Sequence, residues 1–335
     1  MTQVSFGDLA SFYRSQLSNG RLKTQLETLS QEFATGKTSN LRAATGGDMG
    51  NYTGLETALK SLSAYSTAAK EVTLFAQTLQ TSLETVQDTT SDVASSLILA
   101  GSTAEATAVQ TAATDARSQF DTVVSVLNTK VADRALLAGT EIGRNAVADP
   151  EVMLADLQTA IAAETTAAGI TAVVKSWFDD PGGGFETLGY LGGNTDLAAV
   201  RIGPAEEADL SFRADNQSLR DVLKGYAMAS LVADGALSGD HEERTALVAA
   251  AGNQLLTSDY GLSGLRANVG TIEAKIDSSR ARNSAEASAL EMAQAGIVAI
   301  DPYQAAIELQ AAENQLESLY TITARLSRLN LADYL

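Results

Sequence analysis

The chain has 335 residues, 45% hydrophobic and 5% aromatic, so it can form a core, built mostly from Ala, Leu and Val. Its 41 acidic and 23 basic side chains give a net charge of −18 with the single His neutral, which argues against binding of nucleic acid or an anionic membrane. The absence of Cys excludes disulfides and thiol catalysis. We expect a soluble chain, because we find neither a secretory signal nor the roughly 18 apolar residues of a membrane span.

The first 40 residues predict a helix with one apolar stripe. Gly20 interrupts the stripe, at a cost of about 1 kcal/mol relative to Ala. A glycine-rich segment, residues 44–51, follows the helix. The stripe has spacings typical of a helix face and comprises Leu9, Phe12, Leu17, Leu22, Leu26, Leu29 and Phe33.

Residues 55–100 contain neither Gly nor Pro and predict a long helix with near-heptad apolar spacing. If continuous, this segment forms a rod of about 70 Å. A second stripe from Val109 to Val131 predicts an antiparallel partner, and it ends at the glycine-containing segment 136–143.

The middle of the chain, residues 140–239, has a different pattern. It holds Trp177 and a glycine-rich run, DDPGGGFETLGYLGGNTD. Two short alternating stretches, residues 199–203 and 209–214, predict a β-hairpin joined by a turn at residues 204–208. We expect a small mixed domain that loops out of the helical rod.

Helical patterns return after residue 240. We expect one segment around Leu247 and a second, longer one from Leu262 to Ile300, followed by a terminal helix with Asp301 as N-cap and Pro302 at its first position. The apolar residues of this last helix reach the end of the chain and are Leu309, Leu316, Leu319, Ile322, Leu326, Leu329, Leu331, Tyr334 and Leu335.

The candidate catalytic, metal and cofactor motifs are weak. His241 lies in a hydrophilic run and no G-x-S-x-G elbow is present, so we expect an ordinary exposed histidine. Carboxylate pairs such as Asp179 with Asp180 are adjacent in sequence, and adjacent side chains point apart. The glycine-rich runs lack the Gly-Lys-Ser/Thr ending of a phosphate loop. We therefore expect no catalytic residue, no metal and no cofactor.

These patterns predict a mainly α fold: a long antiparallel helical rod with a coiled-coil core, built from both chain ends, with an inserted small α+β domain that contains a β-hairpin. We expect terminal assembly helices at residues 1–45 and 303–335, a rod domain at residues 46–140 and 240–302, and an outer domain at residues 141–239.

Charge is unevenly divided along the chain. Residues 1–37 carry four cations and three anions, and residues 303–335 carry two cations and four anions, so the ends have net charges of +1 and −2 and the rest carries −17. Nearly neutral apolar helices can pack against many copies of themselves without like-charge repulsion. This indicates a homo-oligomer, a ring or tube, formed through the chain ends.

Several segments resemble the flagellin superfamily and, within it, the family of hook–filament junction proteins (the third hook-associated protein). The helix before EFATGKTSN, with Gly36 and Lys37, resembles the family's Gly-Lys element. Leu136 to Gly143, LLAGTEIG, resembles its Phe-Ala-Gly turn, with Leu137 where Phe is common. The segments YLGGNTDLAAVRIG and LSGLRANVG and the ending LSRLNLADYL also resemble it. The family often has a paired-Asp or Asp-Pro turn where this chain has ATGGDMGN.

The resemblance implies a secreted structural protein of the bacterial flagellum, exported by the type III route with a chaperone on its C-terminal helices. It implies no enzymatic activity, and its partners would be copies of itself, another hook-associated protein and flagellin. Two other readings stay open, a flagellin and a cytoplasmic coiled-coil scaffold. An enzyme is the least favoured class.

Overall fold

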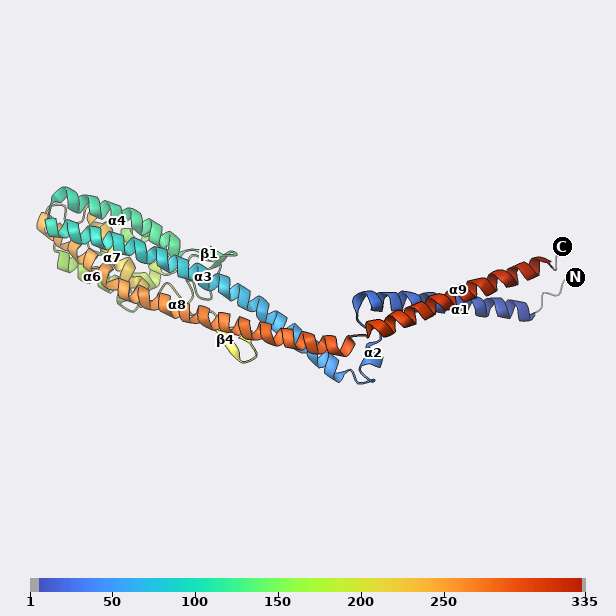
Figure 1. Cartoon of the computed structure of the whole chain (residues 1–335). Coiled ribbons are helices and arrows are strands. Elements are labelled where there is room, and N and C mark those ends of the chain that lie inside the picture. The colour runs from blue at the N-terminus through green and yellow to red at the C-terminus, as the bar shows by residue number, and fades with distance from the viewer. Residues whose placement is uncertain (1–5, 333–335) are drawn as a thin grey trace. The chain divides into compact units, whose positions relative to one another are not determined.

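The computed structural model describes residues 6–332, with side chains described at residue 10 and residues 13–325. The chain divides into two compact units, Met1–Ser63 with Ser284–Leu335 (unit 1) and Ala64–Asn283 (unit 2) (Figure 1). The elements are α1 (Phe6–Thr35), α2 (Leu41–Ala44), α3 (Gly50–Thr103), α4 (Ala106–Leu127), β1 (Lys130–Val131), β2 (Arg134–Ala135), α5 (Pro150–Ala160), α6 (Ala167–Asp179), the π-helical turn η1 (Phe185–Gly189), β3 (Val200–Gly203), β4 (Glu206–Ala208), α7 (Gln217–Ala233), α8 (His241–Val298) and α9 (Pro302–Ala332).

The long helices form as predicted, so the mainly α fold is confirmed. Helix α3 runs through the whole Gly- and Pro-free segment, and its apolar heptad positions from Leu79 to Val93 are buried in unit 2. Helix α4 turns back after Ala104, whose φ of 50° makes the reversal. The Glu105 side chain then accepts a hydrogen bond from the Ala108 N–H and caps α4.

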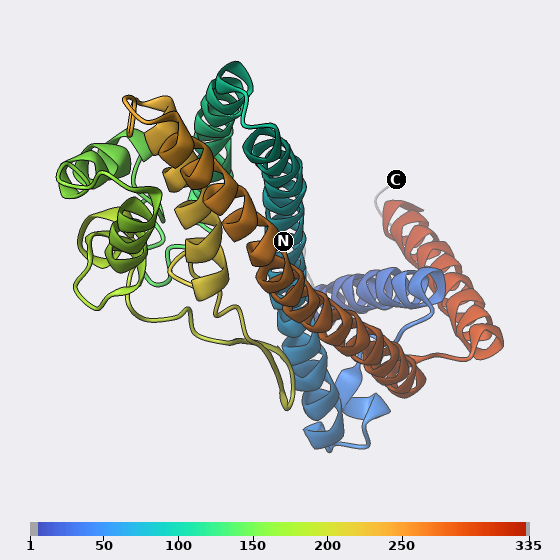
Figure 2. The same ribbon diagram turned by 90° about the vertical axis from the view of Figure 1, so that its left-hand side faces the viewer.

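Helix α7 lies at the centre of unit 2. It packs against α4, α5 and α6, and Figure 2 shows these helices grouped around it. The rings of Phe120 on α4 and Tyr226 on α7 stack with centroids 6.0 Å apart. Because α7 is covered on several sides, twelve of its seventeen residues are buried and it anchors the core.

The two helical segments expected after residue 240 are one helix, α8, so that part of the prediction is wrong. Two of its internal glycines, Gly252 and Gly261, permit close packing instead of breaking the helix. A Cβ at Gly252 would lie 2.9 Å from Ile98 of α3, and one at Gly261 would lie 2.6 Å from the Ser218 hydroxyl oxygen of α7. The close packing of α3 and α7 against these two glycines outweighs the cost of about 1 kcal/mol that each glycine adds to forming a helix.

The predicted β-hairpin is present, but its second strand is misplaced. Strand β4 is Glu206–Ala208, which lies in the expected turn, and residues 209–214 form no strand. A bulge at Ile202 interrupts the ladder. There the Ile202 carbonyl accepts hydrogen bonds from Ser279 Oγ at 3.0 Å and Asn283 Nδ2 at 2.7 Å on α8, which fixes the hairpin to that helix.

Nearly half of the middle region is helical, in α5, α6, η1 and α7, which its glycines concealed. Trp177 contacts Phe178 edge-on with centroids 4.7 Å apart, and its indole N–H donates to Asp156 Oδ2 at 2.6 Å. A Cβ at Gly184 would overlap the indole ring of Trp177. The glycine-rich run is therefore a close-packed segment around an aromatic cluster, and not a phosphate loop.

The segment Leu136–Gly143 is a junction of three loops. Gly139 has a φ of +56°, and a Cβ there would lie 2.6 Å from the Thr195 carbonyl oxygen. The Ala138 carbonyl accepts the Gly193 N–H at 2.9 Å, and the Leu137 carbonyl accepts the Ala214 N–H at 2.9 Å. Glycine is required at position 139 because a side chain there would collide with the segment that contains Thr195.

A nearly buried ion-pair cluster joins α6 to α7. Lys224 Nζ lies 2.7 Å from Asp179 and 2.6 Å from Asp221. Burial alone would raise the pKa of Asp179, but hydrogen bonds from Lys224 and Gln217 outweigh burial and hold the pKa below its usual value. A carboxyl with a lowered native pKa stabilises the fold above its unfolded pKa of about 3.9, and this contribution is lost as the pH falls.

We therefore expect Asp179→Asn to lower the free energy of unfolding by about 1 to 3 kcal/mol at pH 7, and by less as the pH falls below about 3.9, because the unfolded carboxyl is then protonated and the contribution of the ionised native carboxyl is progressively lost. Urea unfolding followed by the fluorescence of Trp177, the single tryptophan, measures both values. The exposed neighbour Asp180→Asn is the control. A deficit independent of pH would contradict the role of this pair.

Candidate functional site: the terminal helix pair

Helices α1 and α9 form an antiparallel pair in unit 1 (Figure 1). At one end Ser15 Oγ lies 3.4 Å from Thr323 Oγ1. At the other end the Ile300 N–H donates to the Gly36 carbonyl at 3.1 Å. Segments from opposite ends of the sequence are thereby placed side by side.

A heptad seam joins the two helices. Leu22, Leu26 and Leu29 of α1 occupy it, and Leu29 is buried. On α9 the seam positions follow spacings of four and three, and the alanines among them, Ala305 and Ala312, are the buried ones. The remaining seam leucines, Leu309, Leu316 and Leu319, are half-buried. The pair is thus held by one narrow stripe.

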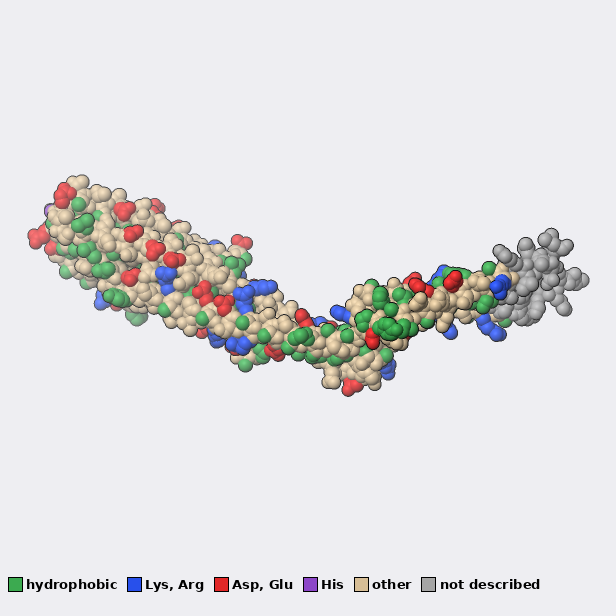
Figure 3. Space-filling view, in the orientation of Figure 1, with side chains coloured by type: hydrophobic (Ala, Val, Ile, Leu, Met, Phe, Trp, Pro, Cys, Tyr) green, Lys and Arg blue, Asp and Glu red, His purple; other side chains and the backbone are tan. Residues whose placement is uncertain are grey.

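Apolar side chains outside the seam remain in solvent. Leu17 is 64% exposed, Ile322 is 55% exposed and Tyr303 is 78% exposed. Figure 3 shows hydrophobic side chains gathered on the surface of this helix pair. Large apolar side chains that gather at a surface are candidates for an interaction site. We call the following set the outer face: Tyr13, Leu17, Phe33, Tyr303, Ile307, Tyr320 and Ile322.

The expected assembly residues fall into three groups. Leu22, Leu26, Leu29, Leu309, Leu316 and Leu319 meet in the seam, whereas Leu17, Phe33 and Ile322 belong to the outer face. The side chains of Leu9, Phe12, Leu326, Leu329 and Leu331, together with Tyr334 and Leu335, lie outside the described residues. Sequence reasoning missed Tyr13, Tyr303, Ile307 and Tyr320, whose aromatic or β-branched side chains at exposed helix positions were the available signal.

The Gly-Lys element ends α1. Gly36 has a φ of +68° and its N–H donates to the Glu32 carbonyl at 2.8 Å, a left-handed helix C-cap. Lys37 then pairs with Ala299 in an antiparallel bridge. The Glu32 side chain accepts the Ser39 N–H at 2.6 Å. The bridge ties the end of α1 to the segment that precedes α9, and the other two contacts fix the turn after α1.

His241 has a structural contact. It is the first residue of α8, and its Nε2 lies 2.7 Å from the Ala104 carbonyl at the turn between α3 and α4. A hollow of about 390 Å³ beside it is lined mainly by Ala and Gly, with Glu242 and Thr245. The Thr245 hydroxyl donates to the His241 carbonyl at 2.8 Å, so it is engaged with its own helix.

Residues 6–332, which the structure describes, hold neither a metal-binding cluster nor a membrane-spanning helix. No group of three or more His, Asp or Glu side chains in that range is placed to hold a metal ion. No helix in that range is long and apolar enough to cross a membrane.

The seam and the outer face should respond differently to the same substitution. We expect Leu26→Ala to speed hydrogen exchange of the α9 amides about 5- to 30-fold in the monomer, because losing a half-buried Leu costs about 1 to 2 kcal/mol. Leu17→Ala, the matched control on the outer face, should leave exchange unchanged. Equal acceleration by both variants would contradict the division between seam and outer face.

Comparison with known proteins identifies the C-terminal part of the chain. Residues 258–335 match the model of the bacterial flagellin C-terminal helical region. A comparison with curated protein sequences found no match. A Vibrio parahaemolyticus protein assigned as a flagellar hook-associated protein has a similar structure, with a TM-score of 0.50 and 14% identity over 73% of this chain and 94% of that one.

FlgL of Bacillus cereus, at 15% identity over 71% of this chain and 94% of that one, has a TM-score of 0.41. Residues 258–335 are therefore similar to the bacterial flagellin C-terminal helical region, and the fold of the chain is similar to that of a flagellar hook-associated protein.

Proposed function

We propose that this chain is a structural component of the bacterial flagellum that joins hook to filament and assembles through its N- and C-terminal helices. The observation that carries the proposal is the apolar outer face of the α1–α9 pair, in which α9 lies within the segment that matches flagellin. Such a surface is costly in water and is stabilised when other copies cover it.

The energetics of a two-helix pair support assembly. Ordering one residue costs about 1 to 2 kcal/mol of backbone conformational entropy, which burial must offset. In the described part of α1, Leu29 is the only buried residue, and in that of α9 only Ala305 and Ala312 are buried. Contacts with neighbouring copies supply the burial that the pair lacks, and the small net charges of the two ends limit repulsion.

The proposed flagellar function also implies partners, a location and a domain arrangement. The neighbours are copies of the chain in a ring or tube, another hook-associated protein and flagellin. A chaperone binds the C-terminal helices before export, and the protein resides outside the cell in the flagellum. Residues 141–239 form an outward domain, residues 46–140 and 240–302 form the rod, and no catalytic step is involved.

Gene deletion tests the joining role. We expect the deletion strain to keep its hooks, to lose its filaments and to release unpolymerised flagellin, because the adaptor between the two structures is missing. Electron microscopy and analysis of the culture medium measure both outcomes. Loss of the filament protein itself would instead identify the chain as a flagellin, and normal flagella would favour a cytoplasmic scaffold.

Limited proteolysis tests the dependence of the chain ends on assembly. We expect residues 1 to 40 and 303–335 to be cleaved first in the purified monomer and to be protected in isolated flagella, because intersubunit burial offsets the cost of ordering them. Unit 2, with its buried core, is the internal control. Equal protection of the ends in both states would contradict assembly through the terminal helices.

A further inference from the structure

We propose that the groove along α1 at Gly20 receives helix α9 of a second copy of this chain, with Arg14 and Arg21 of one copy against Glu313 and Glu317 of the other. This inference rests on the proposed assembly function and specifies which surfaces meet. It assigns a role to Gly20, which no contact inside the described chain explains.

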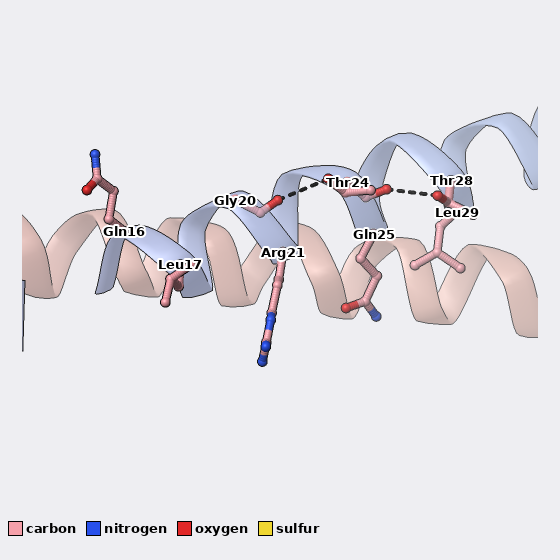
Figure 4. Close-up of a pocket in the computed structure, with 8 residues that line it drawn as sticks. All are labelled: Gln16, Leu17, Gly20, Arg21, Thr24, Gln25, Thr28 and Leu29. Carbon is pink, nitrogen blue, oxygen red and sulfur yellow. Dashed lines mark hydrogen bonds between the residues drawn. The ribbon is translucent and has the colours of Figure 1, made fainter. Parts of the chain in front are cut away.

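The groove has one wall. Its volume is about 660 Å³ and all of its lining residues belong to α1. Leu29 at one end is buried in the seam with α9, whereas the other lining residues are exposed or half-buried. Figure 4 shows Leu17, Arg21, Gln25 and Leu29 projecting from one side of the helix. A helix from another molecule can supply the opposite wall. The lining comprises Gln16, Leu17, Gly20, Arg21, Thr24, Gln25, Thr28 and Leu29.

Gly20 is unexplained by the monomer. It lies inside α1, has no positive φ, and a Cβ there would meet no atom within 4 Å. A glycine at such a position costs about 1 kcal/mol relative to Ala. In α8 the glycines at 252 and 261 admit neighbouring helices closely, and Gly20 offers the same access to an external helix.

The floor of the groove can be covered at little polar cost. The Thr24 hydroxyl donates to the Gly20 carbonyl at 3.1 Å, and the Thr28 hydroxyl donates to the Thr24 carbonyl at 2.9 Å (Figure 4). Because both hydroxyl donors are satisfied within α1, an arriving helix leaves neither of them unpaired.

Charge selects α9 as the occupant. Residues 13–28 carry three cations and one anion, and residues 302–325 carry three anions and one cation. Arg14 and Arg21 are seven residues apart on one face of α1, and Glu313 and Glu317 are four apart on one face of α9. None of these four side chains has an ion pair within the described residues. Packing α1 on α1 would instead place arginine beside arginine.

Filling the groove is the first test. A deletion strain is complemented with Gly20→Leu, and the chain is measured in isolated hook–filament structures and, unassembled, in the medium. We expect incorporation to fall at least tenfold while secretion continues, because Leu preserves the helix but occupies the groove. Gly264→Leu, at another helical glycine with no atom within 4 Å, is the control and should incorporate normally.

Charge reversal is the second test. We expect Arg14→Glu with Arg21→Glu to reduce incorporation, and Glu313→Arg with Glu317→Arg in the same chain to restore it. Lys23→Glu makes the same charge change on the opposite side of α1 from Arg14 and Arg21, and should have little effect. Loss without rescue would mean that the arginines meet a partner other than α9, which overturns the choice of occupant.

The two hypotheses fail differently. If the unmodified chain is absent from isolated flagella, the proposed function itself is wrong. If the unmodified chain is present and the Gly20→Leu and arginine variants are incorporated equally well, the groove is not an assembly surface, and the joining function stands.

Discussion

Two helices packed together can bury only one stripe of side chains on each, and this limit governs unit 1. The seam between α1 and α9 uses Leu22, Leu26 and Leu29 on one side, and on the other side its buried members are alanines. Small residues let the helices approach, but they contribute little buried area. The larger apolar residues, among them Leu17 and Tyr303, consequently remain on the outer face.

Unit 2 shows the opposite balance. Helix α7 is surrounded, so its side chains, including the nearly buried Lys224, must be satisfied from within the chain. Buried polar groups elsewhere in unit 2 are also satisfied from within the chain. The Ile202 carbonyl, for example, accepts hydrogen bonds from Ser279 and Asn283. Unit 2 closes its own core, whereas unit 1 presents surface for other molecules, and this contrast supports the proposed structural role.

Local patterns identified most helices but not every break. Residues 55–100 and the Asp301–Pro302 entry to α9 were predicted because a helix reports its own period and caps in sequence; Asp301 accepts the Tyr303 N–H at 2.8 Å. The division of α8 was wrong because Gly252 and Gly261 resemble helix breaks in the sequence, whereas in the structure they are points of close packing. The predicted position of the second hairpin strand was wrong because a strand of three residues has too little alternation in its sequence to fix its position.

The amino-acid sequence by itself determined the helical class, the heptad stripes at both ends and the near-neutral charge of those ends, because these depend on spacing and composition. Only the tertiary structure decided which apolar residues belong to the seam and which to the outer face. Leu26 and Leu17 look alike in the sequence, and their difference arises only when α9 covers one side of α1. In the sequence Gly20 likewise resembles a helix defect, whereas in the structure it lines an open groove.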